Sequence, residues 1–176
     1  MSNLVKNIIR FILFLFVQVF ILNQIPALHH LVNPYLYFVF ILWLPFDTGR
    51  RTLMILGLAT GLVLDFFTKT PGLHAAACVF ISYIRPFIIN LLISNQGTDN
   101  NYEEPSIRSL GLAPYFTYVT VLTFVHHSIL FLLEALQFGG ILYFLGKTFL
   151  SLLVSLLLIM IVELLFIRKQ SFRTNT

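Results

Sequence analysis

The chain has 176 residues, of which 58% are hydrophobic and only 10% are charged; a typical soluble domain has about 45–50% and about 25%. This composition excludes an ordinary soluble domain and predicts an all-α integral membrane protein. The formal net charge of +4 does not indicate a nucleic-acid partner, because the basic residues stand at the ends of apolar runs and form no patch. One cysteine, Cys78, excludes a disulfide framework and a CxxC metal site within one chain.

Six apolar runs predict transmembrane helices at residues 8–25, 35–46, 52–67, 73–93, 114–138 and 144–167. No hydrophilic stretch between them is long enough for a second domain, so we expect residues 1–176 to form a single multispanning transmembrane domain. The first run follows two basic residues as in a signal peptide, but no cleavage site comes after it, so we expect it to remain as a span. The second and third runs are shorter than the roughly 20 residues of a bilayer crossing, and they could instead form a re-entrant pair.

The distribution of lysine and arginine predicts that both termini are cytoplasmic. With six spans in that orientation, the outer side carries only Lys69 and Lys147, and Arg85 lies within a span. The inner side carries Lys6, Arg10, Arg50, Arg51, Arg108, Arg168, Lys169 and Arg173. This bias agrees with the positive-inside rule, and the opposite orientation would invert it.

The stretch from Gly57 to Ala77 predicts a helical hairpin with one carboxylate, Asp65, near its turn. Gly57 and Gly61 are four residues apart, so one face of the first helix has little bulk and lets another backbone approach closely. Gly72 follows a proline and supplies the turn. Because a carboxylate at bilayer depth costs about 2.5–3.5 kcal/mol on insertion scales, we expect Asp65 to have an internal structural role or to contact a partner.

Two further charges, Arg85 and Glu163, lie inside predicted spans. In the proposed topology they stand about 12 Å and about 6 Å from the inner ends of their helices at 1.5 Å rise per residue, an offset that an arginine side chain can cover. We therefore expect an ion pair that joins the fourth and sixth spans.

The histidines do not predict a metal site. His127 and Glu134 share a helix face, but they are about 10 Å apart along the axis and cannot both bind one ion. We expect His126 and His127 to be packed or solvated, and we expect no metal, cofactor or catalytic residue. His29 and His30 lie in a predicted loop.

Three aromatic residues, Tyr35, Tyr37 and Trp43, stand toward the two ends of the second run. Tyrosine and tryptophan are enriched at both membrane–water interfaces. We therefore expect these three side chains to be interfacial anchors.

The chain resembles the rod shape-determining MreD family in its size, in the near absence of soluble parts, and in the pattern formed by Gly57, Gly61, Asp65, Gly72 and the small residues 75–77. The resemblance implies a non-enzymatic scaffold of the bacterial cell-elongation machinery in the plasma membrane. It further implies binding to an MreC-like single-span protein and, through it, a link between MreB-like filaments and peptidoglycan synthases. The fold would be similar to the substrate-binding components of energy-coupling-factor transporters.

A vitamin-binding transporter component is the alternative. That family docks on its partner through small residues of the first span, whereas residues 11–25 offer only Phe, Leu, Ile, Val, Gln and Asn. Such a face is too bulky for close helix approach.

Three short patterns, in residues 103–108, 46–50 and 29–33, match those of CAAX-type intramembrane proteases. They occur in the opposite chain order and fall in connections, so we do not expect protease activity.

Overall fold

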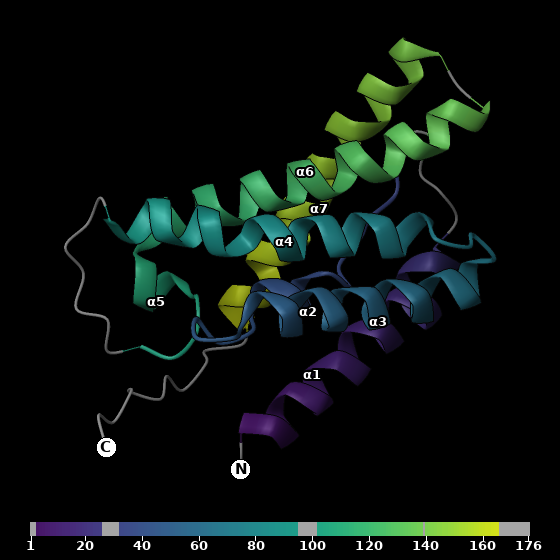
Figure 1. The fold of residues 1–176 in the computed structure, drawn as a ribbon. Coiled ribbons are helices and arrows are strands. Elements are labelled where there is room, and N and C mark those ends of the chain that lie inside the picture. The colour runs from purple at the N-terminus through teal and green to yellow at the C-terminus, as the bar shows by residue number, and fades with distance from the viewer. Residues whose placement is uncertain (1–2, 26–31, 95–101, 139, 166–176) are drawn as a thin grey trace.

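The computed structural model describes residues 3–25, 32–94, 102–138 and 140–165, and every regular element within these ranges is helical (Figure 1). Five helical segments in them are long and apolar enough to cross a membrane: Leu4–Gln24, Arg50–Thr68, Leu73–Ile93, Leu112–Leu136 and Ile141–Leu165. The all-helical prediction is confirmed for the described ranges, and the five segments are those of a multi-pass membrane protein.

The first spanning segment is not a uniform α-helix. It consists of α1 (Asn3–Phe16), a π-helical stretch η1 (Val17–Ile21) and a short 3₁₀ stretch η2 (Leu22–Gln24). A π-helical turn widens the helix locally and redirects side chains. Here it carries Gln18, which is completely buried.

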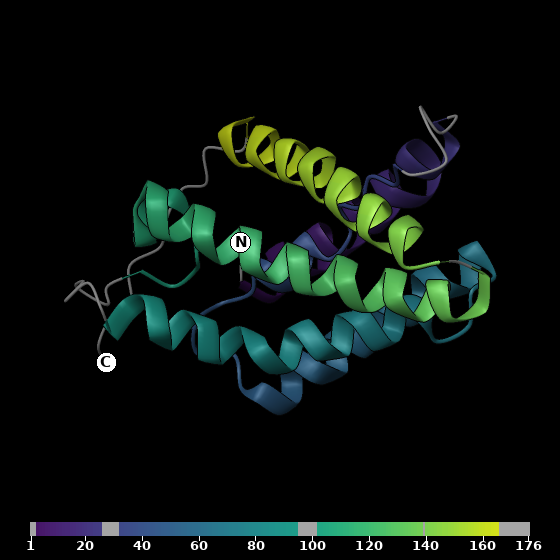
Figure 2. The ribbon, with the colours of Figure 1, turned by 90° about the horizontal axis from the view of Figure 1, so that it is seen from above.

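The remaining long helices form a layered bundle. The helices α3 (Arg50–Thr68) and α4 (Leu73–Ser94) make an antiparallel hairpin. The helix α6 (Leu112–Phe138) lies between α4 and α7 (Ile141–Leu165) when the bundle is seen from above (Figure 2). A four-residue helix, α5 (Ile107–Leu110), precedes α6, and the side-chain and backbone groups of Ser106 and Ser109 cap it reciprocally.

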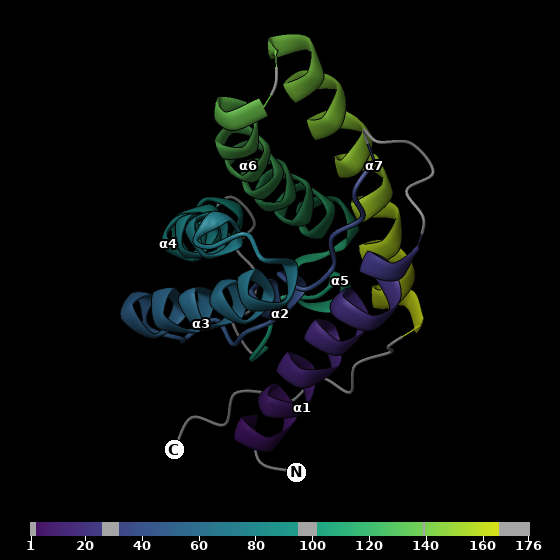
Figure 3. The same ribbon diagram turned by 90° about the vertical axis from the view of Figure 1, so that its right-hand side faces the viewer.

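The predicted helical span at residues 35–46 is wrong in its secondary structure. Residues 32–46 form an extended stretch followed by one short helix, α2 (Val39–Leu42), and a turn. We call residues 32–46 the central segment, because they lie in the space that the long helices surround (Figure 3). Tyr37 to Trp43 are buried throughout. Backbone without helical bonding is tolerated at membrane depth only when protein surrounds it, and that condition is met here.

Contacts define the two ends of the bundle. At one end, which we call the turn end, lies the tight connection between α3 and α4. We call the other end the Glu104 end. There Lys6 of α1 bonds to Glu104, and the backbone N–H of Ile107 donates to Glu163 of α7. The helix α1 therefore begins, and α7 ends, at the same end of the bundle.

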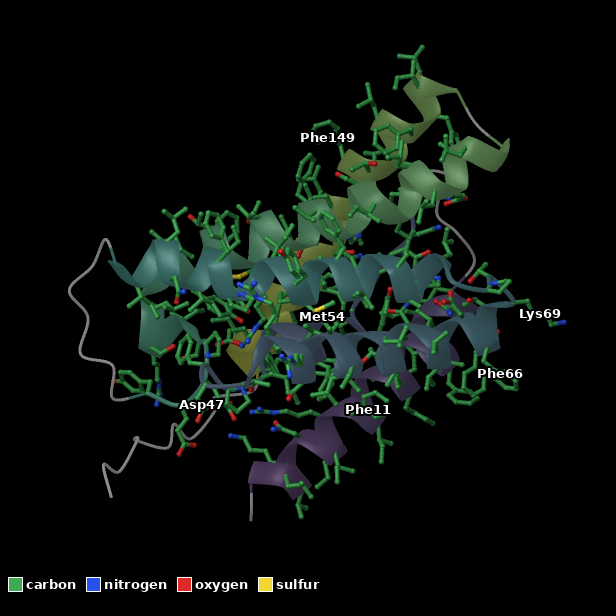
Figure 4. All side chains as sticks on the ribbon, in the orientation of Figure 1. Phe11, Asp47, Met54, Phe66, Lys69 and Phe149 are labelled. Carbon is green, nitrogen blue, oxygen red and sulfur yellow. The ribbon has the colours of Figure 1, made fainter. Side chains whose placement is uncertain are left out.

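The outward surface of the long helices is apolar. Leu142 of α7 and Phe66 of α3 are 83% and 81% exposed, and Figure 4 shows Phe66 and Phe149 projecting away from the bundle. Large exposed apolar side chains over several helices are expected on a surface that faces lipid or another membrane helix.

Candidate functional site

Asp65 holds the turn between α3 and α4. Its carboxylate accepts hydrogen bonds from the backbone N–H groups of Gly72, His74 and Ala75 at 3.1, 2.9 and 3.0 Å, and from the hydroxyl of Thr70 at 3.2 Å. The first N–H groups of a helix have no partner within the helix, and the helix dipole favours a negative charge there. The buried carboxylate therefore caps the N-terminus of α4.

The glycines of the hairpin allow close contact between its two helices. A Cβ atom at Gly57 would lie 2.8 Å from the carbonyl oxygen of Cys78, and one at Gly61 would lie 2.7 Å from the carbonyl carbon of His74. Gly72 has φ of +85° in the turn, a conformation that glycine adopts without strain. The small face of α3 thus packs against α4 of the same chain.

Gln18 provides hydrogen-bond partners for backbone groups in the extended part of the central segment. Its side-chain oxygen accepts from the N–H groups of Leu36 and Tyr37 at 2.7 and 3.4 Å, and its amide nitrogen donates to the carbonyl of Pro34 at 3.1 Å. An unpaired backbone group inside the membrane would cost several kcal/mol. A polar side chain of the first span therefore replaces the hydrogen bonds that a helix would have made.

Two serines of α7 perform the same task on the other side of the central segment. The hydroxyl of Ser151 accepts from the N–H of Asn33 at 2.9 Å, and that of Ser155 accepts from the N–H of Tyr35 at 3.0 Å. Nε2 of His127 lies 3.1 Å from the Ser155 hydroxyl, and its Nδ1 lies 2.9 Å from the carbonyl of Thr123.

Arg85 bonds to the backbone of the central segment at its C-terminal end. Its guanidinium donates to the carbonyls of Leu44 and Pro45, and its Nε donates to the hydroxyl of Tyr118 at 2.9 Å. The Tyr118 hydroxyl in turn donates to the carbonyl of Leu42 at 2.8 Å. The Arg85 side chain is 1% exposed, and its guanidinium is solvated by the carbonyls of Leu44 and Pro45, which follow α2.

The predicted ion pair between Arg85 and Glu163 is wrong for the described residues. Glu163 accepts a hydrogen bond from the hydroxyl of Tyr115 at 2.8 Å, and Tyr115 accepts one from the Trp43 indole at 3.0 Å. The two charges are therefore engaged with different tyrosines of α6, and Arg85 is also engaged with carbonyls of the central segment.

The prediction of interfacial anchors at Tyr35, Tyr37 and Trp43 is also wrong. Tyr37 and Trp43 are buried and Tyr35 is only partly exposed, because all three belong to the central segment. Their polar atoms find partners inside the bundle, as in the hydrogen bond from Trp43 to Tyr115.

A buried network of histidines and tyrosine lies beside the central segment. The hydroxyl of Tyr37 is 3.0 Å from Nδ1 of His74 and 2.8 Å from Nε2 of His126. The ring of Phe38 stacks on His126 with centroids 4.3 Å apart. His126 and His127 are fully buried, which agrees with the prediction of packed histidines.

The residues that the structure covers contain no cluster of three or more His, Cys, Asp or Glu that could hold a metal ion. Two of the protease-like patterns, residues 46–50 and 103–108, meet at the Glu104 end, where the N–H of Phe46 donates to the backbone carbonyl of Glu103. Asn33 of the third pattern lies at the opposite end of the central segment, where its N–H donates to Ser151. His29 and His30 lie outside the described residues.

A cavity of about 1610 Å³ opens at the turn end. Its apolar walls include Leu22 of η2 and Val154 and Leu158 of α7, and its polar lining includes Asn33 and His74. At the Glu104 end, Lys6 and Arg10 pair with Glu104 at 2.7 and 3.0 Å and tie α1 to the α4–α6 connection.

The candidate residues named from the sequence are thus brought into two groups. Gly57, Gly61, Asp65 and Gly72 shape the hairpin. Arg85 of α4 and Glu163 of α7 instead bond to the end of the central segment and to Tyr115, respectively. Sequence reasoning missed Gln18, Ser151 and Ser155. The signal was present, because polar side chains in apolar runs face the bundle interior.

Comparison of the chain with protein-family models, with curated proteins and with solved structures finds no match.

Proposed function

We propose that the protein is a non-enzymatic membrane scaffold of the bacterial cell-elongation machinery. It would bind an MreC-like single-span protein in the plasma membrane and so help to couple MreB-like filaments to the peptidoglycan synthases that maintain rod shape. The resemblance of residues 57–77 to the MreD family motivates the proposal.

One observation carries the non-enzymatic part of the proposal. The buried polar groups Gln18, Asp65 and Arg85 are engaged in bonds that hold the chain's own backbone. Catalysis in a membrane needs a polar constellation that meets substrate, with a nucleophile, a base and donors for the developing charge. Side chains already satisfied by backbone groups are suited to holding a fixed shape.

The proposed topology has six crossings and both termini in the cytoplasm, in a fold resembling energy-coupling-factor substrate-binding components. The central segment would supply the second crossing. Its first residues bond to Ser151 of α7, and its last residue bonds to Glu103 at the Glu104 end. Lys6 and Arg10 at the Glu104 end would face the cytoplasm, as the positive-inside rule requires.

A partner would be recognised through the apolar outer faces of the helices. Such faces include that of α3 and α4, where Leu58 is 44% exposed, and that of α7, where Leu153 is 63% exposed. Association of membrane helices relies on close packing, and the rigid hairpin would present a fixed surface for it.

The test is photo-crosslinking in cells at Leu58 and, separately, at Leu153, followed by identification of the crosslinked protein. We expect an MreC-like protein to be crosslinked at one of the two positions. We also expect the same protein to co-purify with the wild-type chain when no crosslinking is applied. Capture from neither face, with no co-purification of the same protein, would overturn the scaffold proposal.

A substrate-binding component of a vitamin transporter is the second candidate, and the cavity at the turn end favours it. That function predicts that the purified protein retains a vitamin and co-purifies with ATP-binding cassette subunits. The two outcomes are distinguishable in the same preparation.

A further inference from the structure

The cavity at the turn end contains a buried polar group that the fold leaves unused. His74 lines this cavity and is 2% exposed. Its Nδ1 bonds to Tyr37, and no other side-chain hydrogen bond of His74 occurs among the residues that the structure describes. Its second ring nitrogen, Nε2, is therefore available to a ligand.

The hydrogen-bond network next to His74 determines whether its Nε2 is a hydrogen-bond donor or an acceptor. Nδ1 of the fully buried His126 has no partner among the described residues. A buried N–H without an acceptor is rarer than an acceptor left incomplete, so the proton of neutral His126 belongs on Nε2, which then donates to Tyr37. The Tyr37 hydroxyl also interacts with the thiol of Cys78, but sulfur is a weaker acceptor than an imidazole nitrogen, so the hydroxyl donates to Nδ1 of His74 and His74 carries its own proton on Nε2. The cavity thus presents an N–H donor.

The charges around the cavity favour a neutral ligand. Of the charged side chains in its lining, Glu134 forms an ion pair with Lys147, and Lys69 projects away from the bundle (Figure 4). Asp65, close behind His74, is already capped by backbone donors. A ligand bearing a net charge at His74 would therefore find no opposite charge to balance it.

The walls and rim favour a molecule with a long apolar part. The rim contains Ile25, Phe67 and Leu136, which are 48%, 51% and 76% exposed. The volume of about 1610 Å³ exceeds the roughly 300–1,000 Å³ of a small-molecule pocket. An apolar rim on membrane helices opens the cavity toward acyl chains.

We propose that this cavity binds a neutral amphiphile, with a carbonyl or hydroxyl oxygen accepting from Nε2 of His74 and an acyl chain lying against Val154 and Leu158. The proposal does not depend on the scaffold function. The Tyr37 and His126 network acts as a positioning device that fixes the tautomer of His74.

The test uses the full-length protein in detergent, with monoolein as the probe and native mass spectrometry as the readout. Wild type should bind monoolein. Val154→Trp fills the cavity and should abolish binding, whereas Leu153→Trp, its neighbour on the exposed face of α7, should bind as wild type. His74→Phe keeps the ring volume but removes the donor, and it should bind about tenfold more weakly, the loss expected for one hydrogen bond.

Every variant is first checked for a single folded species by size-exclusion chromatography. Equal binding by the Val154 and Leu153 variants would show lipid adhering to the outer surface and would overturn the proposal. Preference for anionic oleoyl-lysophosphatidylglycerol over monoolein would also overturn it. Binding of nicotinamide without binding of monoolein would assign the cavity to a water-soluble ligand instead.

Discussion

Replacing Gln18 by methionine tests the role of the side chains that surround the central segment. The substitution keeps the length and approximate volume of the side chain but removes its acceptor and its donor. The N–H of Leu36 and the carbonyl of Pro34, which bond to Gln18 at 2.7 and 3.1 Å, lose this partner. Both lie in the extended part of the central segment, where no helical partner replaces it.

The expected loss of stability follows from these groups. A buried donor or acceptor left unsatisfied costs about 1–3 kcal/mol, and measured side-chain hydrogen bonds in membrane proteins are weaker, about 0.6 to 2 kcal/mol. Gln18 bonds three backbone groups, and the bond to Tyr37, at 3.4 Å, is the weakest. Counting only the two shorter bonds, the expected decrease in the free energy of unfolding is about 2–4 kcal/mol.

The assay is steric trapping in bicelles, which measures this free energy without strong denaturant. Gln24→Met is the matched control, because Gln24 is exposed and, among the described residues, its side chain bonds only the carbonyl of Val19, at 3.4 Å. The control should lose less than about 0.5 kcal/mol, as is usual for surface substitutions. If Gln18→Met behaves like the control, the reasoning about the central segment is refuted.

Three further perturbations probe the hairpin and the buried charges. Asp65→Leu removes the cap of α4 and should cost about 1–3 kcal/mol in the same assay; an unchanged value would mean that water replaces the carboxylate. Gly61→Ala forces a Cβ against the α4 backbone, whereas a Cβ at Gly72 meets nothing within 4 Å. Gly72→Ala should cost about 1 kcal/mol for the positive φ. Gly61→Ala should lower the thermal midpoint of unfolding more than Gly72→Ala does, and the reverse order would contradict the close packing of α3 against α4. Arg85→Glu combined with Glu163→Arg should not recover the folded yield that either single reversal loses, because the two residues have different partners; recovery would reinstate a direct ion pair.

Much of the fold could be predicted because apolar length and turn chemistry are local properties. The predicted helices at residues 52–67 and 73–93 correspond to α3 at Arg50–Thr68 and α4 at Leu73–Ser94. The glycines and the carboxylate of the hairpin are informative because a small face and a buried charge each need a particular neighbour.

The central segment could not be predicted because its conformation depends on residues far away in the chain. Its run of apolar side chains is as compatible with a buried helix as with any other buried element. What permits the extended backbone is the joint supply of bonds from Gln18, Ser155 and Arg85, which stand up to 120 positions apart from the groups they bind.

The same cause explains the errors on individual residues. The sequence predicts a pair of Arg85 and Glu163 because both are charged and an arginine side chain can cover the difference in their depths. The central segment offers its carbonyls to Arg85, and α6 offers the hydroxyl of Tyr118 to Arg85 and that of Tyr115 to Glu163. Tyr37 was placed at the interface on residue type, whereas its segment carries it into the core.

Hydrogen–deuterium exchange of the protein in nanodiscs tests the central structural claim most directly. We predict that the amides of Leu36 and Tyr37, although they lie outside any regular helix, exchange as slowly as those in the middle of α4, and that Gln18→Met accelerates their exchange specifically. Exchange at these two amides as fast as at the turn between α3 and α4, in the unmodified protein, would contradict it.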